Sequence, residues 1–307
     1  MKRATSAGAA LLLGLTLALS SSFGQEQQRN SRIRVEVNLV NILASVLDRN
    51  GRPVLDLPKE SFELLEDGVP QTVERFEAET NQPLDLALMI DTSLSALKEL
   101  RFEGEAAAHF IRQVVRPNDR LAVFEFSDTV TELSQFSSKV PEQQDAARRL
   151  VPGAGTSMYD GIMLGSQAIS RLPADRRRAI VLVTDAGETT SVAKFEDARR
   201  AAIFSGALLY SIVVRPVKNE SGRNTAGEHA LETITDSTGG AMYYPDDLSQ
   251  LDAMFDRIDR ELRTQYLLGY YPNPRPPAGS YRRIEVRVKG GYTLHYRKGY
   301  FAGGAAQ

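Results

Sequence analysis

Cysteine is absent from all 307 residues of the sequence. This absence excludes a disulfide framework, a thiolate metal site and a lipid-modified N-terminal cysteine. The sequence also lacks a basic cluster interleaved with aromatic residues, and its formal net charge is −2, so nucleic acid is not expected as a partner. Only three histidines are present, far apart along the chain, which argues against a zinc site. The hydrophobic fraction of 42% is that of a soluble globular protein of one or two domains.

Long hydrophobic runs are lacking as well, and the one run that stands out is near the N-terminus. Lys2 and Arg3 precede apolar residues 9–19, which are too few to span a membrane and are followed by small residues. This pattern predicts a secretory signal peptide over residues 1–24 that is cleaved after Gly24, and no transmembrane segment in the mature chain. Because export without cysteine is typical of bacteria, we expect the protein in the periplasm, on the cell surface or secreted.

The two ends of the remaining chain have the texture of β structure. Residues 25–32 are polar and are expected to form a disordered linker. From Ile33 onward apolar and polar residues alternate, and residues 33–80 and 265–302 each contain a few strand-like pieces between turn residues. Because neither flank has enough strands to be stable alone, we expect the two to pair into one sandwich-like module. Two separate small domains are the alternative.

Between the flanks, residues 84–264 alternate apolar strands with helices. Nearly continuous apolar strands are expected at 84–90 and 179–184, and helices at 96–114 and 248–263. Such βα units predict a doubly wound, Rossmann-like α/β fold, in which helices cover both faces of a mostly parallel sheet. Ligands of these sheets bind outside the carboxyl ends of the strands.

Oxygen-bearing side chains follow the first of these strands. Asp91, Ser93 and Ser95 are spaced two residues apart, so their side chains converge as the chain turns from strand to helix. Three hard oxygen donors suit a small divalent cation such as Mg²⁺. The same residue types also cap helix N-termini, and this second interpretation stays open.

Two further positions supply oxygen donors in the same domain. Thr156 follows a glycine-rich loop, and Asp185 ends the second apolar strand. Beside Thr156, the Ser157 hydroxyl is a candidate to bind a metal-bound water or to cap the next helix. Asp160 is interpreted chiefly as a carboxylate in the first turn of that helix.

These residues carry a resemblance to a known family. Residues 84–263 resemble a von Willebrand factor A domain, because Asp91 to Ser95 match the Asp-x-Ser-x-Ser signature of its metal-ion-dependent adhesion site. Thr156 matches the loop threonine of that site, and Asp185 matches the aspartate of its Thr-Asp-Gly motif. Ala186 departs from the pattern, since the family usually carries glycine there. The flanks resemble those of bacterial exported proteins related to this family.

The resemblance implies an adhesion module and not an enzyme. In the family, a Mg²⁺ ion, here with Mn²⁺ or Ca²⁺ as alternatives, is bound directly by the residues that match Ser93, Ser95 and sometimes Thr156. Asp91 and Asp185 would act through water. A partner protein's Asp or Glu then completes the coordination, because an ion with few direct carboxylate ligands keeps much of its charge.

Two other functions stay open at this point. One is a structural assembly domain whose metal site is vestigial. The other is Mg²⁺-dependent phosphoryl transfer. It is disfavoured because Ser93 stands where the Asp-x-Asp arrangement of haloacid-dehalogenase-type phosphatases needs a second aspartate, and because no Walker-type glycine loop with lysine is present. A serine hydrolase is disfavoured further, since no Gly-x-Ser-x-Gly motif occurs.

Two remaining patterns have structural interpretations. The run Arg176–Arg178 is interpreted as a solvated turn before a strand. The apolar stripe of the last predicted helix is interpreted as core packing, with members Leu251, Met254, Phe255, Ile258 and Leu262.

Overall fold

The computed structural model describes residues 39–78, 82–94, 100–173, 175–214 and 224–303. The predicted signal peptide, the polar linker 25–32 and Ser95 lie outside these residues. Along the described part of the chain, no helix combines the length and the apolar character needed to cross a membrane.

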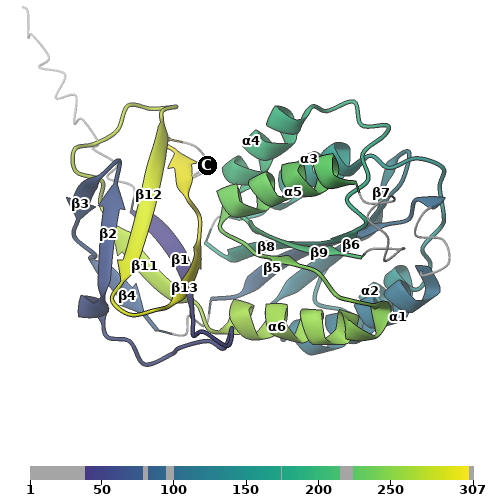
Figure 1. Ribbon diagram of the computed structural model, residues 1–307, viewed down its shortest axis with the longest axis horizontal. Coiled ribbons are helices and arrows are strands. Elements are labelled where there is room, and N and C mark those ends of the chain that lie inside the picture. Colours follow the sequence, from purple (N-terminus) through teal and green to yellow (C-terminus); the bar gives the residue numbers. More distant parts are fainter. Residues whose placement is uncertain (1–38, 79–81, 95–99, 174, 215–223, 304–307) are drawn as a thin grey trace, which may run out of the picture. The chain divides into compact units, whose positions relative to one another are not determined.

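A six-stranded sheet forms the centre of the α/β domain, in the order β10-β9-β8-β5-β6-β7 (Figure 1). Its strands are β5 (Leu84–Asp91), β6 (Arg120–Phe126), β7 (Val130–Ser137), β8 (Arg177–Thr184), β9 (Leu208–Val213) and β10 (Met242–Tyr243). All neighbouring strands pair in parallel except β6 and β7, which are antiparallel. The carboxyl ends of β5 and β8 therefore meet at the same edge of the sheet.

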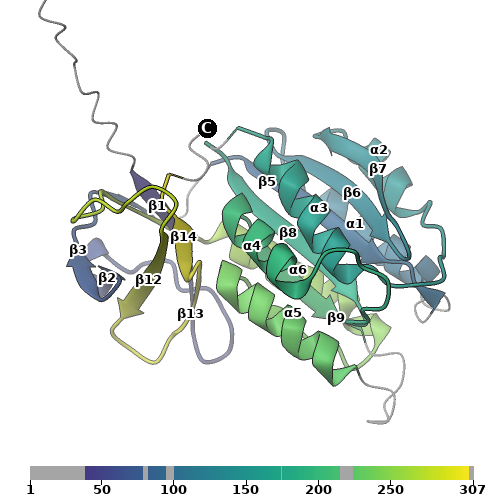
Figure 2. The ribbon, with the colours of Figure 1, turned by 90° about the horizontal axis from the view of Figure 1, so that it is seen from above.

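Helices cover both faces of this sheet, as Figures 1 and 2 show. They are α1 (Leu100–Val114), α2 (Val140–Ala147), α3 (Met158–Ser170), α4 (Phe195–Ser205), α5 (Thr225–Thr238) and α6 (Leu251–Arg263). Leu86 and Leu88 of β5 pack with α1 and α6, whereas Ala87 and Met89 pack on the opposite face with α3. Because β5 faces apolar helices on both sides, its side chains are all buried, and those from Leu86 to Ile90 are all apolar.

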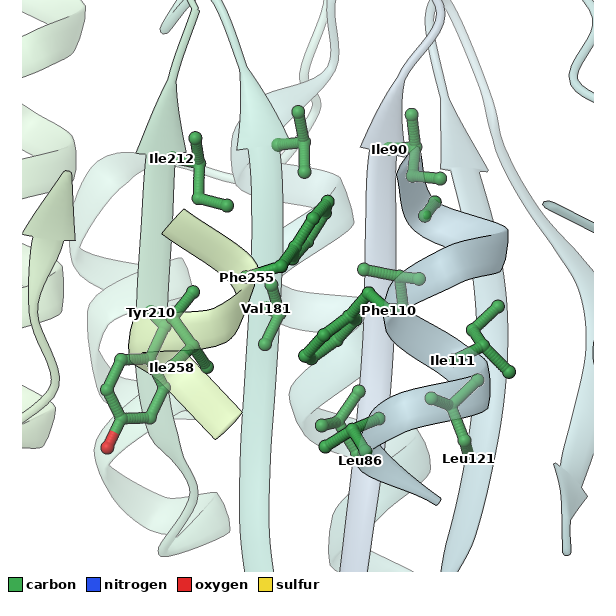
Figure 3. Packing of buried hydrophobic residues seen from close by; sticks show 14 of the residues in the cluster. Leu86, Ile90, Phe110, Ile111, Leu121, Val181, Tyr210, Ile212, Phe255 and Ile258 are labelled. Atoms are coloured by element: carbon green, nitrogen blue, oxygen red, sulfur yellow. The ribbon is translucent and has the colours of Figure 1, made fainter. Parts of the chain in front are cut away.

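The face covered by α1 and α6 is shown from close by in Figure 3. Phe110 of α1 stacks on Phe255 of α6, with ring centroids 4.5 Å apart, above the strands of the sheet. Ile258 and Leu262 continue this contact along α6 and are buried. The prediction that the stripe of this helix packs in the core is confirmed.

The flanking segments form two four-stranded antiparallel sheets, in the orders β13-β1-β11-β4 and β14-β12-β2-β3. Their strands are β1 (Val40–Leu47), β2 (Phe62–Glu66), β3 (Val69–Gln71), β4 (Arg75–Glu77), β11 (Tyr266–Tyr270), β12 (Tyr281–Val288), β13 (Thr293–Tyr296) and β14 (Gly299–Phe301). In each sheet, strands from before the α/β domain pair with strands from after it: β1 with β11, and β2 with β12.

One hydrophobic core fills the space between these two sheets. Ile42 and Leu268 from one sheet pack in the same cluster as Leu64 and Val286 from the other. The two sheets with their shared core are named the β module below. The predicted fold class is confirmed: a mostly parallel α/β domain is inserted between flanks that together form a small sandwich.

The chain enters the α/β domain at Leu84 and leaves it after Arg263, and one carboxylate contacts both positions. Asp119 is buried and accepts a hydrogen bond from the Leu84 backbone N–H through Oδ1, at 2.7 Å. Its Oδ2 pairs with the Arg263 guanidinium at 2.8 Å. The two crossings between the α/β domain and the β module are thus joined at a single side chain.

Two elements were not delimited by the sequence pattern. Strand β1 spans Val40–Leu47, and residues 33–38, where the alternating pattern begins, lie outside the described residues. Helix α5 spans Thr225–Thr238, because Asn224 caps its N-terminus and Gly239 ends it in the left-handed conformation.

One prediction from the sequence differs from the structure, and it concerns the arginine run before β8. Arg177 and Arg178 are only 3% and 7% exposed, so the prediction of a solvated turn is wrong for them. Their guanidinium groups donate to backbone carbonyls, which makes burial of the long side chains possible: Arg177 to Gln82, and Arg178 to Ser205 and Leu172.

Candidate metal centre

The ends of β5 and β8 position the first carboxylate of the predicted site. The register pairs Ile90 with Val183, so Asp91 and Thr184 follow side by side. The Thr184 hydroxyl donates to Asp91 Oδ2 at 2.6 Å, and the Ser93 backbone N–H donates to Oδ1 at 2.9 Å. Both oxygens of Asp91 are therefore held in place by neighbours.

Asp91 is buried, with 1% of its surface exposed. The position of Asp91 directly after an apolar strand did not predict this burial. Burial, followed by the negative charge of Asp185, raises the pKa of Asp91 to about 6, although the hydrogen bonds from Thr184 and Ser93 act in the opposite direction. The site thus holds a carboxylate that is unfavourable when ionised and that gains from a nearby cation.

The loop that carries Thr156 attaches directly beside Asp91. Ser93 forms an isolated parallel bridge with Gly153, whose N–H donates to the Thr92 carbonyl at 2.9 Å. Asp128 Oδ1 accepts the Ala154 N–H at 3.1 Å and fixes the other side of the loop. A side chain at Gly153 is excluded, because a Cβ there would lie 2.0 Å from the Ser127 hydroxyl.

Thr156 and Asp185 meet around Gly187. A Cβ added to Gly187 would lie 2.8 Å from Asp185 Oδ1 and 3.3 Å from the Thr156 hydroxyl oxygen, so both oxygens surround the same point. The Gly187 N–H donates to Asp185 Oδ1 at 2.7 Å. Thr156 itself is buried, and its carbonyl accepts the Thr189 N–H at 2.8 Å. The glycine leaves open the space that these oxygens share.

Ala186 adopts a backbone conformation that favours glycine. Its φ is +61°, in the left-handed region, and its side chain is fully buried. This φ favours glycine, which is also the residue that the family usually carries at this position. The Ala186 carbonyl also requires a glycine opposite, because a Cβ at Gly227 of α5 would lie 1.9 Å from it. Helix α5 thus holds the turn that follows Asp185.

Ser157 and Asp160, the two neighbours of Thr156, have different surroundings. The Ser157 hydroxyl is fully buried and has no hydrogen-bond partner, and it does not cap α3 although Ser157 is the N-cap residue. Asp160 instead accepts hydrogen bonds from the Val192 and Ala193 N–H groups at 2.9 and 2.8 Å. The carboxylate of Asp160 therefore anchors a loop, whereas the Ser157 hydroxyl is left for another partner.

Part of the α/β domain resembles a known family in sequence. Residues 86–188 match the family described as the von Willebrand factor type A domain. The fold of the α/β domain is of the von Willebrand factor A type. No curated protein matches the chain in sequence.

Solved structures are similar to this chain at low sequence identity. A von Willebrand factor type A protein from Catenulispora acidiphila is 12% identical, with a TM-score of 0.50, over 88% of this chain and 75% of that one. The vWF domain of the type V pili tip protein Mfa5 from Porphyromonas gingivalis is 13% identical, with a TM-score of 0.49, over 60% of this chain and 96% of that one. The PilB minor pilin from Streptococcus sanguinis is 13% identical, with a TM-score of 0.46, over 60% of this chain and 62% of that one. At these identities the likeness concerns the fold alone.

The structure brings four of the five predicted site residues of the A domain to one edge of its sheet. They are Asp91, Ser93, Thr156 and Asp185. Ser95, the fifth, lies outside the described residues. Two residues that position the site were not predicted from the sequence: Thr184, which holds Asp91, and Asp128, which holds the Thr156 loop.

Proposed function

We propose that this protein is an exported binding module that holds a divalent cation and binds an acidic group of a protein partner. The cation proposed is Mg²⁺, with Mn²⁺ or Ca²⁺ as alternatives. The observation that carries the proposal is the convergence of Asp91, Ser93, Thr156 and Asp185 at the carboxyl edge of the A-domain sheet. Strand ends at this edge are where sheets of this class bind ligands.

The residues present fit a small, hard cation. All four donors are oxygens, two from hydroxyls and two from carboxylates, which is the donor type that Mg²⁺ prefers. The buried Ser157 hydroxyl without a partner adds a further oxygen beside Thr156. Among the described residues no group of three or more His, Cys, Asp or Glu forms a metal cluster, which is consistent with a site that relies on hydroxyls. Softer metals that need imidazole or thiolate ligands are not favoured.

The charges of the site support a role in binding. When the cation is bound, it supplies positive charge that a partner carboxylate can neutralise. Hydrogen bonds within the protein hold both carboxylates in place. Thr184 and the Ser93 N–H donate to Asp91, and the Gly187 N–H donates to Asp185. Because Asp91 and Asp185 would act through water and not as direct ligands, the ion would keep much of its charge, and an acidic partner group would gain from approaching it.

Metal binding is tested by calorimetric titration of the purified protein with Mg²⁺. We expect weak binding, and ion at ten times its dissociation constant should stabilise the fold by about 1.4 kcal/mol. Asp91→Asn should abolish the heat. Asp145→Asn is the matched control, because Asp145 is a carboxylate 72% exposed on α2 and away from the strand ends. Absence of binding by the folded wild-type protein would contradict the proposal.

Partner binding is tested by capture from a bacterial envelope extract with Mg²⁺ and with EDTA. We expect EDTA and Asp91→Asn to abolish capture alike. Amidation of the carboxylates in the extract should abolish it as well, since an acidic group is proposed to bind the ion. A parallel assay for phosphate release from a generic phosphoester tests the enzyme alternative. Phosphate release that Asp91→Asn removes, together with capture that persists in EDTA, would favour phosphoryl transfer.

Export is part of the proposal and rests on the pattern of residues 1–24. The mature protein recovered from a producing bacterial cell should begin at Gln25. N-terminal sequencing of the fractionated protein checks this, and an intact N-terminus in the cytoplasm would refute export.

A further inference from the structure

A cavity of about 450 Å³ lies at the amino-terminal end of β8, where the A domain meets the β module. Leu84 pairs with Arg177 at this end, whereas Asp91 and Asp185 end the same strands, so the cavity lies about 25 Å from the metal centre. Its described lining contains five arginines and one carboxylate, that of Asp175: Arg75, Arg176, Arg177, Arg178 and Arg297. We name it the arginine cavity.

Two of these arginines have carboxylate partners. Arg75 pairs with Glu77 at 2.6 Å, and Arg176 pairs with Asp85 at 2.8 Å. Asp85 is fully buried and already pairs with Arg120 outside the cavity, so a single negative charge serves two cations. The acidic groups at this end of the domain therefore do not balance the basic ones.

The other three arginines donate to backbone carbonyls, which are dipoles without net charge. Arg177 donates to Gln82, Arg178 to Ser205 at 2.8 Å, and Arg297 to Asn41 at 2.7 Å. Burial and the nearby Arg263 charge lower the pKa of Arg177 to about 10, and burial lowers that of Arg178 and Arg297 as well. Asp119 acts on Arg177, and Asp85 and Asp175 act on Arg178, but no described carboxylate forms an ion pair with any of these three arginines. The arginine cavity thus holds more positive charge than the described carboxylates around it balance.

Two donors of the cavity are also left without acceptors. The Nε atoms of Arg178 and Arg297 are buried and have no hydrogen-bond partner, although other nitrogens of both groups are bonded. Arg178 is more than nine-tenths buried. A buried charged donor without an acceptor is unfavourable, and an anionic oxygen is the acceptor that relieves it best.

We propose that the arginine cavity binds a small oxyanion, the carboxylate or phosphate group of a ligand, through Arg178 and Arg297. The guanidinium fork suits both groups, because each presents two neighbouring oxygens that can accept from paired N–H donors. This site is separate from the proposed metal centre in position and in charge. Since its walls come from both the A domain and the β module, a bound anion would also join them.

The test uses the whole mature protein in metal-free buffer, titrated with sodium phosphate and with sodium succinate at constant ionic strength. Sodium chloride at the same ionic strength is the reference for general salt effects. We expect saturable binding of phosphate, succinate or both, and amide exchange should slow in segments 175–178 and 297–303. Binding of one anion only would identify the ligand class. Responses equal to those in chloride would overturn the proposal.

Variants locate the site. Arg297→Gln should weaken anion binding by about tenfold or more, since it removes a charged hydrogen bond in a desolvated place. Arg287→Gln is the matched control, because Arg287 lies on β12 outside the cavity lining and its side chain is 53% exposed. Equal weakening by both variants would indicate a general charge effect and refute the site. If Arg178→Gln, the second variant, fails to fold, Arg297→Gln and the exchange pattern of the wild-type protein still decide the question.

Discussion

Replacing Asp91 by asparagine should stabilise the metal-free protein at neutral pH. Asp91 is buried, and its pKa is raised from 3.8 to about 6 by burial and by Asp185. That difference corresponds to about 3 kcal/mol of unfavourable free energy for the ionised group in the folded state. Asparagine removes the charge but weakens the hydrogen bond from Thr184, which costs about 1 kcal/mol. The expected net gain at pH 7 is about 2 kcal/mol.

The pH dependence follows from the same shift. Between pH 3.8 and about 6 the unfolded chain has lost the Asp91 proton while the folded protein retains it. The free energy of unfolding therefore falls as pH rises through this window, and this contribution is constant above it. Asp91→Asn should remove that decline, so the gain over the wild type should grow from pH 4 to pH 6 and then level off.

Urea denaturation of both proteins in EDTA at several pH values measures the effect. Asp145→Asn serves again as the control, because an exposed carboxylate should give no such profile. Mg²⁺ at one hundred times its dissociation constant should reverse the order of stability, because it would stabilise the wild-type protein by about 2.7 kcal/mol and only that protein is proposed to bind the ion. A wild-type advantage in EDTA at pH 7, or a gain that does not vary between pH 4 and 6, would refute the reasoning.

Three further perturbations test other parts of the structure. Asp85→Ala should cost about 3–5 kcal/mol in urea denaturation, because it leaves two arginines at a buried site without their carboxylate; a loss below 1 kcal/mol would show that water replaces it. Gly227→Ala should weaken Mg²⁺ binding in calorimetry, since its Cβ would displace the Ala186 carbonyl next to Asp185; unchanged affinity would mean that α5 shifts instead. Deleting residues 265–302 removes β11 to β14 and exposes the edges of β1 and β2, so light scattering should detect aggregation; a stable monomer would show that the first flank does not depend on the second.

The sheet of the A domain was predictable from the sequence because its strands are buried on both faces. Leu84 to Ile90 is nearly continuous in apolar residues, and such a run permits few other structures. The oxygen-bearing residues were predictable for a related reason, since polar groups placed directly after a buried strand lie at its end. The convergence of Thr156 and Asp185 around Gly187 required the three-dimensional path of two loops.

The positions that escaped prediction depend on partners distant in the sequence. A threonine at a strand end is common, and only the pairing of β5 with β8 shows that Thr184 holds Asp91. Arginine is ordinarily solvated, so the burial of Arg177 and Arg178 could not be inferred without the carbonyls of Gln82 and Ser205. The burial of Asp91 could not be predicted either, because its partner Thr184 lies on a strand distant in the sequence.

The two crossings joined by Asp119 have a mechanical consequence for a binding module. A domain attached by one linker can swivel about it, whereas the A domain is attached by two neighbouring segments that share one carboxylate. Tension applied by a partner at the carboxyl edge reaches both segments together, at the far end of the sheet. Rotation of the A domain would have to twist the two segments against each other, so the β module and the A domain should follow a pull as one body.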